Sequence, residues 1–122
     1  MKIIFCVEDD ENIRELIEYT LTSMGYGVRG FGCGADFFDA LGQEMPDMVL
    51  LDIMLPDKDG IQILSEIRGD KHTQHLPVIM LTAKTSQLDK IQGLDSGADD
   101  YITKPFDIME LKLKYVFQNQ KS

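Results

Sequence analysis

The chain has 122 residues, of which 43% are hydrophobic and 27% charged, and its formal net charge is −9 at pH 7. This length fits a single domain that buries a core without a disulfide or a structural metal. The acidity argues against a nucleic-acid-binding surface, and no apolar stretch is long enough to cross a membrane. Because the two cysteines fit a reducing compartment, we expect a cytoplasmic protein.

Five short apolar runs predict strands that alternate with amphipathic helices. The expected strands are Ile3–Val7, Gly27–Phe31, Met48–Asp52, Val78–Leu81 and Asp100–Thr103. The second of them contains two glycines, which weaken a strand, so we expect it at an edge of the sheet.

Between these runs, apolar residues recur at helical spacing. The expected helices are Glu11–Met24, Cys33–Leu41, Ile61–Arg68, Thr85–Ser96 and a last one that Asp107 caps and that runs through Phe117. In the first helix we expect Asp10 as the N-cap and an apolar stripe made of Ile13, Leu16, Ile17 and Leu21.

This alternation predicts an α/β fold with a doubly wound, five-stranded parallel sheet and five helices. Parallel strands joined by helices need crossover connections, which are almost always right-handed and place helices on both faces of the sheet. We find no internal repeat, linker or second domain, so residues 1–122 are expected to form one unit.

Polar residues stand where the apolar runs end. Glu8 and Asp9 follow the first run, Asp52 ends the third, Thr82 follows the fourth and Lys104 follows the fifth. Functional groups of such folds gather at the carboxyl ends of the strands. We therefore expect a cluster of carboxylates with one ammonium group and one hydroxyl group at its rim.

The expected cluster offers the chemistry of a magnesium-dependent phosphoryl site. Glu8, Asp9 and Asp52 provide hard oxygen ligands, which Mg²⁺ prefers, and three clustered anions would repel one another without a cation. Lys104 is suited to bind a phosphoryl oxygen, and Thr82 adds a hydroxyl donor. Asp52 is the expected nucleophile, because carboxylates can form acyl phosphates.

Four stretches of the sequence resemble the receiver domain of bacterial two-component response regulators, over essentially the whole chain. They are VEDDENIRELI, LLDIMLPDKDG, PVIMLTA and GADDYITKPF. The resemblance implies a flavodoxin-like sheet with strand order 2-1-3-4-5. It also implies a phosphoacceptor signalling domain, not an enzyme that turns over a substrate.

The same resemblance assigns roles to individual residues. Asp52 would accept a phosphoryl group from a phosphohistidine of a sensor histidine kinase. Mg²⁺ would be held by the acidic residues and by the backbone carbonyl of Met54. Thr82 and Lys104 would respond to the phosphate, and Tyr101 would turn inward as Thr82 moves. The Lys104–Pro105 bond is typically cis in this family.

The run GLDSGADDYITKPF resembles most the OmpR/PhoB-like subgroup, whose members carry a winged-helix DNA-binding domain. That subgroup tends to dimerise through helix 4, strand 5 and helix 5, and here Lys90, Asp99, Asp100 and Lys114 could serve. Gln92 and Val116 depart from the basic residues common there.

No output domain is present in this chain, so it is a receiver half of a longer regulator or a single-domain receiver that acts by protein–protein contact. Direct contact with nucleic acid or membrane is not expected of it.

A phosphatase is the second hypothesis for the same residues, while a calcium loop and a histidine metal site are disfavoured. A haloacid-dehalogenase-like phosphatase would also use an aspartate after an apolar strand, although its second aspartate is replaced here by Met54. Leu55–Glu66 partly matches a calcium-binding EF-hand loop, but Leu55 stands at the first ligand position. His72 and His75 are three residues apart without an evident third ligand.

Overall fold

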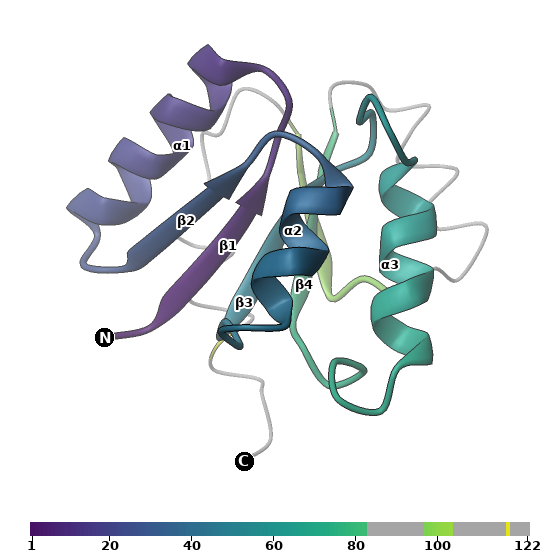
Figure 1. Ribbon diagram of the computed structural model, residues 1–122. Coiled ribbons are helices and arrows are strands. Elements are labelled where there is room, and N and C mark those ends of the chain that lie inside the picture. Colours follow the sequence, from purple (N-terminus) through teal and green to yellow (C-terminus); the bar gives the residue numbers. More distant parts are fainter. Residues whose placement is uncertain (83–96, 104–116, 118–122) are drawn as a thin grey trace.

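The computed structural model describes residues 1–82, 97–103 and 117 (Figure 1). Five parallel strands form one sheet in the order β2-β1-β3-β4-β5. The strands are β1 (Ile3–Val7), β2 (Gly27–Phe31), β3 (Met48–Asp52), β4 (Val78–Thr82) and β5 (Asp100–Thr103). The predicted fold class, strand positions and edge location of the second strand are therefore confirmed.

Three helices are described, and each lies within one or two residues of its prediction. They are α1 (Glu11–Ser23), α2 (Gly34–Leu41) and α3 (Gly60–Gly69). The two later helices were predicted at 85–96 and 107–117, and apart from Phe117 these segments lie outside the described residues. Within the described part of the chain, we find no helix with the length and apolar character needed to span a membrane.

The sheet is covered on both faces, with α1 on one side and α2 and α3 on the other (Figure 1). Side chains alternate along each strand, so Met48 and Leu50 pack toward α1 while Val49 and Leu51 pack toward α2 and α3. Strands β1 and β3 are buried over almost their whole length. This double burial explains why their sequences are continuous apolar runs.

Helix α1 begins as predicted, because the Asp10 carboxylate accepts hydrogen bonds from the backbone N–H groups of Asn12 (2.9 Å) and Ile13 (3.1 Å). Its apolar stripe is narrower than predicted: Ile17 and Leu21 are buried, whereas Leu16 is 55% exposed. A residue next to Ile17 is rotated by about 100° around the helix axis, which places Leu16 on the flank.

Candidate functional site

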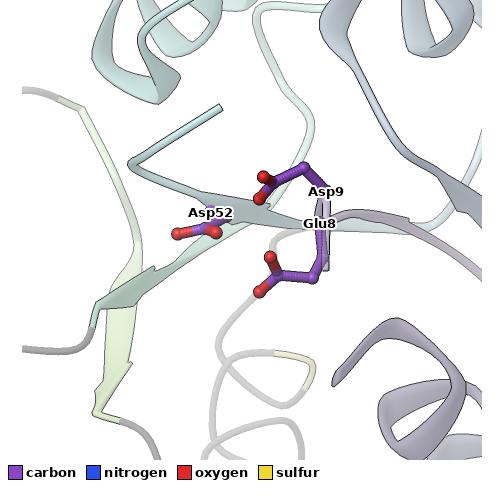
Figure 2. Close-up of side chains that lie close together, drawn as sticks. All are labelled: Glu8, Asp9 and Asp52. Atoms are coloured by element: carbon purple, nitrogen blue, oxygen red, sulfur yellow. The ribbon is translucent and has the colours of Figure 1, made fainter. Parts of the chain in front are cut away.

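Three carboxylates meet at the carboxyl ends of the adjacent strands β1 and β3 (Figure 2). Glu8 and Asp9 follow β1, and Asp52 is the last residue of β3. One carboxylate oxygen from each lies within 4.8 Å of the others. Glu8 and Asp52 are 1% and 5% exposed, while Asp9 is exposed to solvent. The predicted convergence of these residues is thus present in the structure.

The turn between β1 and α1 fixes Glu8 through both its backbone and its side chain. The Glu8 N–H donates to the carbonyl of Phe31 (3.0 Å), and the Glu8 carboxylate accepts from the N–H of Asp10 (3.2 Å). The Arg14 guanidinium donates to the Glu8 carbonyl (2.7 Å). Sequence reasoning missed Arg14, because nothing in its spacing distinguishes it from other charged residues of an amphipathic helix.

The loop after β3 contacts Asp52 both near its start and near its end. One carboxylate oxygen of Asp52 accepts from the N–H of Met54 (3.3 Å). Further along, the N–H of Gly60 donates to the carbonyl of Ile53 (2.8 Å). A Cβ at Gly60 would overlap the Asp52 carbonyl oxygen, so glycine is required for this approach. The side chain of Met54 is 67% exposed.

The donor set fits a hard divalent cation. The cluster has only carboxylate oxygens as side-chain ligands, the type that Mg²⁺ and Ca²⁺ bind. Two of the three carboxylates are almost fully buried, where a cation offsets both desolvation and mutual repulsion. Among the described residues, this is the one group of three or more potential metal ligands.

Two further predicted residues lie on neighbouring strands. Thr82, which is fully buried, ends β4, and its neighbour Leu81 pairs with Asp52 of β3. Tyr101 of β5 pairs with Met80 of β4 and is partly buried against the core on the α2–α3 face. Lys104, with the bond to Pro105, lies outside the described residues.

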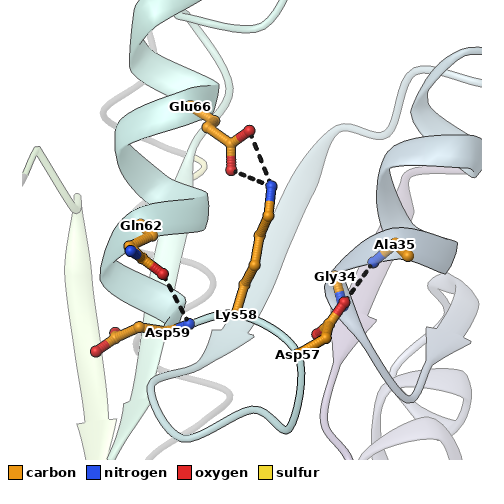
Figure 3. A network of polar contacts seen from close by, with 7 residues as sticks. All are labelled: Gly34, Ala35, Asp57, Lys58, Asp59, Gln62 and Glu66. Atoms are coloured by element: carbon orange, nitrogen blue, oxygen red, sulfur yellow. Dashed lines mark hydrogen bonds and ion pairs between the residues drawn. The ribbon is translucent and has the colours of Figure 1, made fainter.

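The acids of the partial EF-hand match have other partners (Figure 3). Asp57 accepts hydrogen bonds from α2, Asp59 caps α3, and Glu66 pairs with Lys58 at 2.8 Å. They face three different elements and do not surround a common point. The turn at 71–75 holds His72 and His75, and no third ligand joins them among the described residues.

Comparison with known proteins identifies the family of the fold and of this site. Residues 4–115 match the family model described as the response regulator receiver domain. The transcriptional regulatory protein GltR of Pseudomonas aeruginosa is 45% identical over 108 residues, which are 88% of this chain and 45% of GltR. The chain therefore spans about half the length of that relative.

Solved structures agree over nearly the whole chain. The receiver domain of the Francisella response regulator 1452 is 32% identical with a TM-score of 0.84, covering 99% of this chain and 100% of that one. The chemotaxis response regulator CheY4 of Vibrio cholerae is 26% identical with a TM-score of 0.87, covering 95% and 98%. The chain belongs to the response regulator receiver domain family and is a receiver of two-component signalling.

Proposed function

We propose that the domain accepts a phosphoryl group on Asp52 from a phosphohistidine of a sensor histidine kinase. A carboxylate oxygen of Asp52 would attack phosphorus, a P–O bond would form, and the P–N bond to the histidine would break. The imidazole leaves and takes up a proton. The observation that carries this proposal is the meeting of Glu8, Asp9 and Asp52 at the ends of β1 and β3.

The residues of the cluster would divide the work between them. Glu8, Asp9, one oxygen of Asp52 and the backbone carbonyl of Met54 would hold Mg²⁺, which receiver domains generally bind. When bound, Mg²⁺ neutralises charge on the transferring phosphoryl group. The Met54 N–H, which already donates to Asp52, keeps that carboxylate oriented toward the cluster. The domain is proposed as a phosphoacceptor, not as an enzyme with turnover.

Phosphorylation would shift a conformational equilibrium of the domain. The new negative charge would attract Lys104 and the hydroxyl of Thr82, and Tyr101 would fill the space that Thr82 leaves. Thr82 and Tyr101 lie on the adjacent strands β4 and β5, which supports communication between them. The surface that responds would be made by helix 4, β5 and helix 5.

The output is proposed to be transcription, in the cytoplasm. GltR is a transcriptional regulatory protein more than twice as long as the matched segment, which supports an OmpR/PhoB-like regulator with a winged-helix domain outside this chain.

A dimer through helix 4, β5 and helix 5 would serve that output. One oxygen of Asp99 already binds Arg68 within the chain. A single-domain receiver remains the alternative.

The decisive experiment is phosphorylation by acetyl phosphate, followed by intact-protein mass spectrometry with and without Mg²⁺. Wild type should gain one phosphoryl group per chain only with Mg²⁺, and Asp52→Asn should gain none. Asp36→Asn, which removes an equal charge from an exposed helix position, should behave as wild type. Stable labelling of Asp52→Asn would overturn the proposal. Repeated turnover without an accumulating phosphoprotein would instead favour the phosphatase reading.

A further inference from the structure

The carboxylate of Asp57 caps a helix that starts 23 residues earlier in the chain (Figure 3). One oxygen accepts from the N–H of Gly34 (2.9 Å), and the other accepts from the N–H of Ala35 (3.0 Å). These are the first two residues of α2, whose N–H groups have no partner within the helix. The contact joins α2 to the loop that leaves Asp52.

Helix α2 depends on this contact because it has no cap of its own. Cys33 occupies the N-cap position with extended backbone, but its side chain makes no capping hydrogen bond. A thiol is a weak acceptor, and Ser, Thr, Asp or Asn usually fills this position. An added Cβ at Gly34 would lie 2.9 Å from the side chain of Ile63, so glycine lets the start of α2 pack closely against α3, while the Asp57 oxygens lie at an ordinary contact distance of 3.5 Å from that position.

These hydrogen bonds also affect the acidity of the Asp57 carboxyl and the direction in which it points. The N–H of Gly34, and then that of Ala35, lower the pKa of the Asp57 carboxyl below its ordinary value, although the residue is exposed. Both oxygens are directed at α2, so Asp57 is not part of the carboxylate cluster formed by Glu8, Asp9 and Asp52.

The loop between β3 and α3 is held at its two ends and at its middle. At the start, Ile53 receives the N–H of Gly60, and at the end Asp59 and Gln62 form a capping box for α3. Asp57 holds the middle against α2. Lys58 adds a second contact there, with its ammonium 2.8 Å from Glu66 and 5.2 Å from the centre of the Phe38 ring.

We propose that Asp57 is a positioning residue for the metal site: by tying the loop to α2, it holds the Met54 carbonyl where the cation needs it. Met54 lies in the same loop, three residues before Asp57 and two after Asp52. Without the tie, this segment would lose its hydrogen bonds to α2 and would keep the Gly60-to-Ile53 and Met54-to-Asp52 bonds, the capping box of α3 and the contacts of Lys58. The inference rests on the proposed Mg²⁺-dependent phosphorylation of Asp52.

The first test is the Mg²⁺ affinity of Asp57→Ala, measured by isothermal titration calorimetry, with Asp36→Asn as the matched control. Both substitutions remove one negative charge near the start of α2, but Asp36 is an exposed residue of the first helical turn, whereas Asp57 belongs to the loop after β3. Losing a group that orients a metal ligand typically weakens affinity by about 10-fold or more. We expect such a loss in Asp57→Ala and a change below about twofold in Asp36→Asn.

A second variant separates positioning of the loop from simple stabilisation of α2. Cys33→Ser restores a local cap, since a hydroxyl at this position can accept from the N–H of the second or third helical residue. In the double variant Cys33→Ser/Asp57→Ala, slow amide exchange in α2 should return while the Mg²⁺ affinity stays low. The amide NMR shift of Met54 at saturating Mg²⁺ should also remain displaced from wild type.

Three results are distinguishable. If wild type itself binds no Mg²⁺ and is not phosphorylated, the proposed function fails. If wild type binds Mg²⁺ and Asp57→Ala binds it equally well, only the role of Asp57 is overturned. If the double variant regains wild-type affinity together with its helix, Asp57 acts as a helix cap alone, and the positioning role is again overturned.

Discussion

Gly60 is in the tightest backbone contact of the site. An added Cβ would overlap the carbonyl oxygen of Asp52 and lie 2.8 Å from the Cα of Ile53. These neighbours are backbone atoms of the proposed phosphoacceptor and of the residue after it, and backbone cannot move aside as a flexible side chain does. A side chain at this position must therefore displace either α3 or Asp52.

We expect Gly60→Ala to lower the free energy of unfolding by about 1–3 kcal/mol through overpacking. Phosphorylation by acetyl phosphate should also slow, because the displaced strand end carries Asp52. Urea denaturation and mass spectrometry measure the two effects. Gly69→Ala is the control on the same helix: nothing lies within 4 Å of its added Cβ, so stability should be unchanged or rise by up to about 1 kcal/mol. Equal effects of both substitutions would rule out the contact with Asp52 as the cause.

The residues of the site differ in how far the sequence reveals them. Glu8, Asp9 and Asp52 were predictable, because each stands at the end of an apolar run and parallel strands bring such ends together. Asp57 was visible only as a loop acid, since its partners on α2 lie 22 and 23 residues away and are backbone groups. Contacts of that kind leave no periodic pattern in the sequence.

Arg68, near the end of α3, contacts the segments that lead into β4 and β5. The Arg68 guanidinium donates to the carbonyls of Gly97 (2.9 Å), Leu76 (2.6 Å) and Gln74 (3.1 Å). It also contacts the Asp99 carboxylate at 3.1 Å, and the same oxygen of Asp99 accepts from the first residue of β4 at 2.7 Å. Arg68 thus fixes the approach to β4 and the turn into β5 relative to α3.

A planar, five-donor guanidinium is needed to reach acceptors in so many directions, and a lysine ammonium has only three donors at one point. We therefore expect Arg68→Lys to lower the free energy of unfolding by about 1–3 kcal/mol in urea denaturation. Amide exchange of Gly97 and Asp99 should become faster. Arg29→Lys is the matched control, because the Arg29–Glu44 pair is about half exposed and such pairs contribute at most about 1 kcal/mol. If the Arg68→Lys variant were as stable as the Arg29→Lys control, the proposed role of Arg68 in joining α3 to these segments would be contradicted.

The elements themselves were largely predictable, and the differences have local causes. The strand bounds follow from apolar runs, which double burial requires. The first helix was predicted with Leu16 in its stripe, but a three- and four-residue pattern does not reveal which flank of the stripe faces solvent. Arg68 was predicted only as the last residue of a helix, since its partners belong to turns without a regular period.

At the scale of the whole molecule, the carboxylate cluster joins the central strand of the sheet, β3, to its neighbour β1. Glu8 and Asp9 follow β1 and Asp52 ends β3, and these strands lie side by side. A cation bound by all three residues is present only in the folded chain, because unfolding separates β1 from β3. Such binding must raise the stability of the fold by mass action.

We expect Mg²⁺ at 100 times its dissociation constant to raise the free energy of unfolding by about 2.7 kcal/mol. For a domain of this size, that corresponds to a rise in Tm of roughly 8–15 °C in a thermal melt. Asp9→Asn should lose most of the rise, because the exposed Asp9 carboxylate is a direct ligand in the proposed site.

A second explanation for a rise in Tm must also be tested. The net charge is −9, and any added salt screens the repulsion within an acidic chain. Asp36→Asn, which reduces the net charge as much as Asp9→Asn does, should keep the full rise in Tm. NaCl at equal ionic strength should give wild type little of it. If NaCl reproduced the rise, or if Asp9→Asn and Asp36→Asn responded alike to Mg²⁺, the stabilisation would come from general screening, and the three carboxylates would not form a specific site.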